Sequence, residues 1–132
     1  MKNFPESHLN LLEDETRAFV FLATLMPDGS PQVTPVWFNV SGDYILINSA
    51  LGRVKDRNMR ARPSVALAIA DPRNPYRYVQ IRGKVVEITT EGARAHIDAL
   101  AFKYHGQPKY GGPADEQRVI YKIKPARVNT MG

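Results

Sequence analysis

Six short apolar segments, separated by tight-turn signals, limit what this chain can fold into. They span residues 18–25, 31–40, 44–48, 64–70, 76–89 and 118–124. The links at 26–30 (MPDGS) and 41–43 (SGD) combine proline or glycine with aspartate and serine, a composition that favours hairpin turns. Strands joined by tight turns pair antiparallel. Six strands in 132 residues favour closure into a small barrel, because closure removes exposed sheet edges.

Three short helices are expected around these strands, at residues 5–12, 53–60 and 91–104. In the last of them, apolar side chains recur at helical spacing, as at Ala93, Ile97 and Leu100. No repeat, low-complexity tract or linker divides the chain, and its length suits a single domain over residues 1–132. We therefore predict a mainly β (α+β) domain, a six-stranded antiparallel barrel with short flanking helices.

Pro35 lies in the middle of the second predicted strand, within the sequence TPVWF. Proline cannot donate a hydrogen bond to a strand ladder, so Pro35 marks an edge, a bulge or an interruption. Peptide groups freed by an interruption could bind the amide edge of a planar heterocycle. The simpler interpretation, which the residues alone favour, is that Trp37 and Phe38 are core aromatic side chains beside a bulge.

Several classes of protein are excluded by composition. The chain has no cysteine, which rules out disulfides, thiolate zinc sites, iron–sulfur clusters and a cysteine nucleophile. No apolar run approaches the ~20 residues of a membrane span, and the first ten residues lack the apolar core of a signal peptide. His8, His96 and His105 lack zinc-site spacing, so we expect surface or hydrogen-bonded histidines and no metal. We expect a cytoplasmic protein with no membrane partner.

Positive charge is concentrated in two segments. Lys and Arg outnumber Asp and Glu by 18 to 13, which gives a net charge of +5 and favours anionic partners. Residues 53–62 carry five basic residues against one aspartate, and residues 118–127 carry four with no acid.

The sharpest local motif is the junction between the third strand and the second helix, where Ser49 and Gly52 precede Arg53 and Lys55. Free N–H groups at a helix start favour an anion. Cations there oppose the helix dipole by about 0.3–1 kcal/mol each, a cost that a bound anion offsets. Two interpretations remain open from the spacing: a phosphate site with Ser49 as a hydroxyl donor, or a solvated basic helix face.

The order of these segments resembles that of a known group of proteins. The likeness is carried by residues 22–31, 33–38, 53–60 with Pro63, 65–70 and 79–85. With these segments the chain resembles the pyridoxamine-phosphate-oxidase-like superfamily, and within it the small deazaflavin-dependent oxidoreductases that use coenzyme F420. The resemblance implies a six-stranded antiparallel split β-barrel, the FMN-binding split barrel, over nearly the whole chain.

The resemblance also implies a homodimer with a cofactor at the subunit interface. In such proteins the basic segment after the third strand holds the cofactor phosphate, and the segment after the first hairpin lines the ring system. The long strand of the partner subunit closes the site. The residues that match these positions are, for the phosphate, Ser49, Arg53 and Lys55 with Asn58 nearby; for the ring, Thr34, Pro35 and Val36; and for the partner strand, Tyr78 and Gln80.

The function implied by this resemblance is hydride transfer from reduced coenzyme F420 to a small organic acceptor. Because that chemistry belongs to the cofactor, we assign no catalytic side chain. FMN is the alternative cofactor, although Arg57 and Arg60 would suit the polyglutamate tail of the deazaflavin. Another alternative is a protein that binds the cofactor without turnover. Nucleic-acid binding is disfavoured, because no aromatic residue is interleaved with the basic residues of 53–62.

Overall fold

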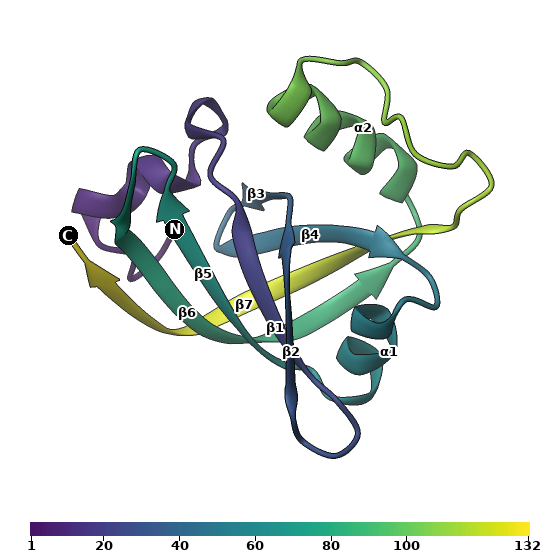
Figure 1. Ribbon diagram of the computed structural model, residues 1–132, viewed down its shortest axis with the longest axis horizontal. Helices are drawn as coiled ribbons and strands as arrows, with labels where there is room; N and C mark the ends of the chain where they lie inside the picture. Colours follow the sequence, from purple (N-terminus) through teal and green to yellow (C-terminus); the bar gives the residue numbers. More distant parts are fainter.

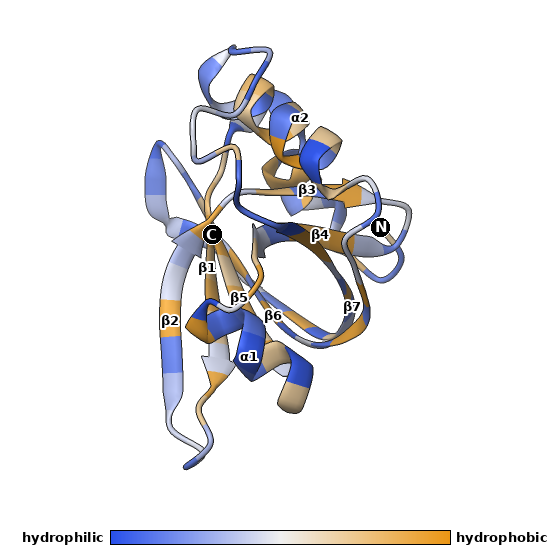
Figure 2. Cartoon of the chain, turned by 90° about the vertical axis from the view of Figure 1, so that its right-hand side faces the viewer, coloured by the Kyte–Doolittle hydropathy of each residue, from blue (hydrophilic) through white to orange (hydrophobic).

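The computed structural model describes all residues 1–132 and shows one antiparallel sheet that curls into a split barrel (Figure 1). The strands run in the spatial order β2-β1-β5-β6-β7-β4-β3. Their bounds are β1 Val20–Leu25, β2 Pro31–Val36, β3 Phe38–Ser41, β4 Tyr44–Ala50, β5 Ser64–Asp71, β6 Asn74–Thr89 and β7 Arg118–Met131. Figure 2 shows how the sheet curves from β2 on one side to β3 and β4 on the other.

The sheet has seven strands where six were predicted. The predicted strand at 31–40 divides at Trp37: its first half, β2, pairs with β1, and its second half, β3, pairs with β4. These two halves form the two opposite edges of the sheet. Pro35 therefore lies on an edge strand, one of the few positions in a sheet where proline is tolerated. The barrel is left open between β2 and β3, and the chain itself bridges the opening at Trp37.

The helices flank this sheet near their expected positions. The first segment forms two 3₁₀ helices, Glu6–Leu12 and Asp14–Thr16, and the α-helices are α1, Val54–Ala61, and α2, Ala93–His105. The last strand extends to Met131, beyond the predicted end at 124, because β6 pairs with it from Ile120 to Met131, where Met131 lies opposite Tyr78. No helix is long and apolar enough to cross a membrane.

The core lies inside the curled sheet. Side chains alternate along each strand, so that on β5 Val65, Leu67 and Ile69 are buried while the alanines between them face outward. The same alternation buries Ile45 and Ile47 on β4. The remaining fully buried side chains of this core include Leu11, Val20, Phe38, Val79, Ile81, Val119, Tyr121 and Ile123.

Helix α2 is fixed to the β2–β3 junction by buried polar contacts. The Lys103 ammonium donates to the Phe38 carbonyl at 2.7 Å, and the Tyr104 hydroxyl donates to the Ala18 carbonyl at 2.6 Å. Burial lowers the pKa of Lys103, which Asp14 at 3.5 Å partly offsets. The Trp37 ring stacks on Tyr104 with centroids 5.2 Å apart. Phe38 is thus a core aromatic residue, as predicted, whereas Trp37 packs against α2.

Gly83 allows β6 to cross β7 closely. The register between the two strands shifts after Arg82, and a Cβ atom at Gly83 would lie 2.5 Å from the carbonyl oxygen of Lys124. That oxygen belongs to the backbone and cannot rotate away.

We expect Gly83→Ala to destabilise the protein by about 1–3 kcal/mol, the usual cost of forcing an extra methyl group into packed structure. Gly111→Ala is the matched control, because nothing lies within 4 Å of the added Cβ there. Urea unfolding monitored by circular dichroism measures both variants. Equal midpoints for the two variants would show that the β6–β7 crossing has no need of glycine.

Candidate functional site

A cavity of about 200 Å³ lies where the β2–β3 junction, the end of β4, the start of α1 and the start of β7 meet. Helix α2 and the loop that follows it cover one side. The cavity is therefore built from segments that are far apart in the sequence. Its lining residues are Pro35, Val36, Trp37, Asn48, Ser49, Arg53, Lys55, Ile97, Tyr110 and Arg118.

The loop between β4 and α1 is held by the buried carboxylate of Asp56. Gly52 has φ of +88°, a conformation that favours glycine, and its N–H donates to Asp56 Oδ2 at 2.9 Å. The hydroxyl of Tyr121 and the Nε of Arg60 donate to Oδ1 of the same carboxylate. Burial alone would raise the pKa of Asp56, but these donors outweigh it and lower the pKa. The ionised carboxylate fixes the loop that carries Arg53.

Three cationic side chains line the cavity. Arg53, Lys55 and Arg118 converge there from the loop, α1 and β7. Lys55 forms no ion pair, and burial, together with the charges of the two arginines, lowers its pKa. The Lys55 charge is partly desolvated and has no acidic partner, and such a charge favours binding of an anion.

Two buried hydroxyl groups on these segments have no hydrogen-bond partner within the protein. They are Ser49 Oγ and Thr34 Oγ1. Ser49 is only 2% exposed and lines the cavity beside the cations. An unpaired buried polar atom costs free energy and is rare in folded proteins. A ligand with acceptor oxygens in the cavity would give the Ser49 hydroxyl its missing partner.

A chain of hydrogen bonds crosses the wall of the cavity. The Glu116 carboxylate accepts from Arg53 at 2.9 Å and from Arg118, whose Nε donates to Asn48 Oδ1 at 2.9 Å. The Asn48 amide in turn donates to the backbone of Ala93 and to His96 Nδ1. We call these linked side chains, Arg53, Glu116, Arg118, Asn48 and His96, the polar chain.

His96 ends the polar chain as a neutral ring. Its Nδ1 accepts from Asn48 at 3.0 Å, so its Nε2–H donates to Asn39 Oδ1 at 2.8 Å. Burial, with a smaller effect of the Arg118 charge, lowers the pKa of His96 to about 4. The expectation of a hydrogen-bonded histidine thus fits its position. No group of three or more His, Asp or Glu residues is arranged to hold a metal ion.

Five of the nine predicted site residues line the cavity. The cavity brings together Pro35, Val36, Ser49, Arg53 and Lys55. Thr34 precedes them on β2, with its hydroxyl buried and unpaired.

The other predicted residues lie elsewhere. The Asn58 amide donates to Thr24 Oγ1 at 3.0 Å, and its oxygen accepts from Arg62, so Asn58 joins α1 to β1 and does not line the cavity. Tyr78 and Gln80 lie on the outward face of β6, paired opposite the alanines of β5, away from the cavity of their own chain.

Sequence reasoning did not assign several lining residues. Asn48 directly precedes Ser49 on β4 and is buried, but an asparagine near the end of a strand is a weak sequence signal for a binding site. Arg118 lies in the second basic segment and Tyr110 in the loop after α2, and only the fold brings them beside Arg53. The Arg118 guanidinium packs over the Tyr110 ring at 4.9 Å, which could not be read from the sequence.

The chain is similar to known proteins both in its sequence family and in its structure. The profile of the pyridoxamine 5'-phosphate oxidase family matches residues 5–132. A solved structure described as an F420 reductase is 37% identical, with a TM-score of 0.84, over 96% of this chain and 98% of that chain. The search of curated proteins found no match.

More distant structures share the fold alone. A conserved hypothetical protein from Mycobacterium tuberculosis is 22% identical, with a TM-score of 0.74, over 97% of this chain and 84% of that chain. The General Stress Protein 26 from Bacillus anthracis is 14% identical, with a TM-score of 0.66, over 94% of each chain.

The neutral His96 makes stability depend on pH. An unfolded histidine binds a proton below about pH 6.5, whereas His96 in the folded protein stays neutral down to about pH 4. The stability that the neutral His96 ring contributes to the folded protein is therefore complete above pH 6.5 and is lost as the pH falls from 6.5 toward 4. Between pH 7 and pH 5 we expect the free energy of unfolding to drop by about 2 kcal/mol from this group.

His96→Gln should reduce this drop, measured by urea unfolding at pH 7 and pH 5. His105→Gln is the control, because His105 is the last residue of the same helix and is exposed. A drop of the same size in wild type and in His96→Gln would contradict the assignment.

Proposed function

The chain belongs to the pyridoxamine 5'-phosphate oxidase family, and from this premise we propose that it is an oxidoreductase that uses reduced coenzyme F420 to reduce a small organic acceptor. The observation that carries the proposal is the Ser49 hydroxyl, buried without a protein partner beside three cations in the cavity. The 37% identity to a structure described as an F420 reductase supports the choice of cofactor. FMN is the runner-up, since it also joins a tricyclic ring to a phosphate.

The residues present fit such a cofactor. Ser49, Arg53 and Lys55 would hold its phosphate, with Arg118 adding charge from β7. Pro35 and Val36, together with Thr34 on β2, would line its ring system. The bound cofactor supplies hydride transfer, so the protein has to bind, orient and exclude water. No side chain is assigned an acid–base role.

The outer basic residues of α1 differ in their availability. Arg60 is engaged by Asp56, with 3.0 Å between its Nε and the carboxylate oxygen. Arg57 is exposed, and its guanidinium donates to the Gly52 carbonyl at 2.7 Å, beside the loop that leads to Arg53. Arg57 is therefore the better candidate to meet an acidic tail that extends from the cavity.

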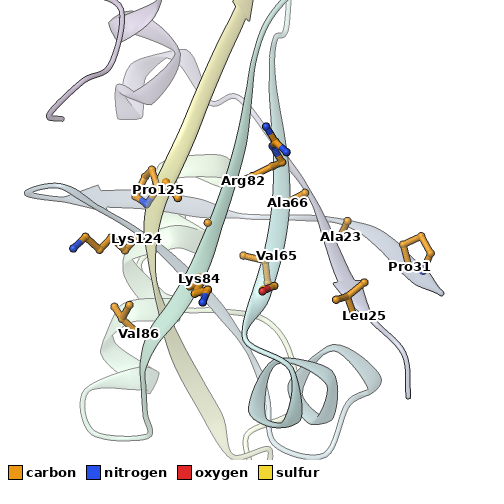
Figure 3. A pocket seen from close by; sticks show the side chains of 13 residues that line it. Ala23, Leu25, Pro31, Val65, Ala66, Arg82, Lys84, Val86, Lys124 and Pro125 are labelled. Carbon is orange, nitrogen blue, oxygen red and sulfur yellow. The ribbon is translucent and has the colours of Figure 1, made fainter. Parts of the chain in front are cut away.

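We also propose that the protein is a homodimer that buries the outward face of β1, β5 and β6. This face is apolar and uncovered: Phe21 is 46% exposed and Val33 on β2 is 63% exposed. Phe21 lies opposite Ala68, which lies opposite Gln80, so the face also carries the partner-strand residues of the predicted site. A groove of about 620 Å³ extends the face between β1 and β7 (Figure 3).

The residues that line this groove are of the kind found at interfaces between two copies of a chain. Ala23, Leu25 and Ala66 form an apolar floor, while Arg82 and Lys84 stand along its β6 side, as Figure 3 shows. Apolar floors with charged rims are typical of interfaces between subunits. Docking there would place Tyr78 and Gln80 of one subunit near the other subunit.

We expect Ala68→Glu to convert the dimer to a monomer, because it places a charge at the centre of the apolar face. Ala95→Glu is the matched control: Ala95 is exposed on α2, away from that face. Sedimentation velocity reports the oligomeric state of both. A dimer of unchanged strength in Ala68→Glu would place the interface on another surface.

The proposed cofactor site is tested by fluorescence titration with coenzyme F420 and, separately, with FMN. In Ser49→Ala we expect cofactor affinity to fall about tenfold or more, since a hydrogen bond to a charged group contributes about 1.5–3 kcal/mol. The stability of the variant without cofactor should be unchanged or higher by up to about 1 kcal/mol, because the lost hydroxyl has no protein partner.

Ser41→Ala, which removes an exposed hydroxyl at the end of β3, is the control and should bind like wild type. Tighter binding of FMN than of coenzyme F420 would move the protein to the flavin branch. Binding of neither would reject the proposal. Binding without oxidation of the reduced cofactor across a panel of acceptors would favour a carrier protein instead.

A further inference from the structure

Glu116 lies closest to the cations of the cavity among the acidic side chains of the chain. One oxygen of its carboxylate accepts from Arg53 Nη2 at 2.9 Å, and the other accepts from Arg118 Nη1. The side chain of Glu116 is 17% exposed, that of Arg118 only 4%, and that of Arg53 45%. Glu116 thus bridges a buried guanidinium and an accessible one.

The backbone of Glu116 and of the next residue, Gln117, is held by hydrogen bonds. Its own carbonyl accepts from Arg94 on α2 at 3.1 Å, and the carbonyl of Gln117 accepts from the N–H of Leu51 at 2.9 Å. The carboxylate is therefore held at the mouth of the anion site by two neighbouring elements. Any exchange of partners there involves the side chain of Glu116 and leaves the loop in place.

Glu116 carries its charge at neutral pH. Burial alone would raise the pKa of this carboxyl, but the hydrogen bonds and charges of Arg118 and Arg53 outweigh it and lower the pKa. Arg118 is further committed by its bond to Asn48, so its position does not depend on a ligand. Arg53 has no other acidic partner than Glu116. Of the two arginines, Arg53 is therefore the one that can exchange Glu116 for a ligand.

We propose that the Glu116 carboxylate is an internal competitor for the anion of this site, so that a bound phosphate group displaces it from Arg53 while Arg118 keeps it. The inference rests on the proposed function in one respect: the phosphate is that of the cofactor. A phosphate group, as a monoester or a diester, presents at least two unesterified oxygens in a tetrahedral arrangement. It can therefore accept from Arg53 with one oxygen and from another donor of the site with the next.

The test is titration of Glu116→Gln with coenzyme F420, and with sulfate as a simple anion. Glutamine keeps an oxygen that accepts from Arg118 but removes the charge that competes for Arg53. We expect affinity for both probes to rise about three- to tenfold, the range that a weakly screened charge within a few ångströms produces. Sulfate binding is followed by thermal shift against chloride at equal ionic strength.

Asp115→Asn is the matched control. It makes the same change of charge one residue away, on an exposed side chain that forms no ion pair. Its affinities should equal those of wild type. An equal gain in Asp115→Asn would show a general effect of net charge and overturn the proposal.

The remaining outcomes separate this inference from the proposed function. Equal or weaker binding of sulfate and cofactor by Glu116→Gln would overturn the competitor, because the carboxylate would then serve only to orient Arg53. If the wild-type protein binds neither cofactor but Glu116→Gln shows a larger thermal shift with sulfate, the proposed cofactor is wrong and the role of Glu116 as an internal competitor stands.

If Glu116→Gln folds poorly by circular dichroism, Glu116→Asp replaces it. The shorter carboxylate cannot reach both arginines, so a smaller gain is expected and no gain would count against the proposal.

Discussion

The passage of the chain from one edge of the sheet to the other at Trp37 is the constraint on which the rest of this structure depends. Because β2 pairs with β1 and β3 pairs with β4, the barrel stays open between its two edges. The opening is where α2 packs, through the stacking of Trp37 on Tyr104 and the bond from Lys103 to the Phe38 carbonyl. The cavity forms below this contact, with Pro35 and Val36 on one wall. A closed barrel would leave no room for it.

The charges at the opening are arranged so that acids hold the structure and bases face the cavity. Asp56 is buried and satisfied by three donors, and it fixes the loop at Gly52. Glu116 neutralises the buried Arg118 from the other side. Of the three cations that line the cavity, only Lys55 lacks an acidic partner, and its burial, together with the charges of Arg53 and Arg118, lowers its pKa. The anion site thus has a rigid support and an uncompensated charge, a combination that binds an anion with little reorganisation.

Much of the fold could be predicted because the sequence pattern is local. Turn residues, apolar runs and helical spacing located five of the seven strands as single segments, and the motif resemblance identified the family. The division at Trp37 was missed, because a proline shows that a strand is interrupted but not which strand each half joins. Within the candidate site, Ser49, Arg53 and Lys55 are neighbours along the chain, so the sequence alone could group them, and all three line the cavity. Arg118 and Glu116 are more than sixty residues away, and only the pairing of β4 with β7 brings them there.

The contrast between Asn58 and Ser49 shows how a structure separates polar residues that serve the fold from those that serve a ligand. Both are 2% exposed, and both stand near the basic helix. Asn58 has its amide and its oxygen paired within the protein, so a ligand would have to compete for it. Ser49 has no partner, so folding has already carried the cost of desolvating its hydroxyl. A ligand that accepts from Ser49 gains a hydrogen bond without a further cost of desolvating that hydroxyl. Its affinity is higher for this reason.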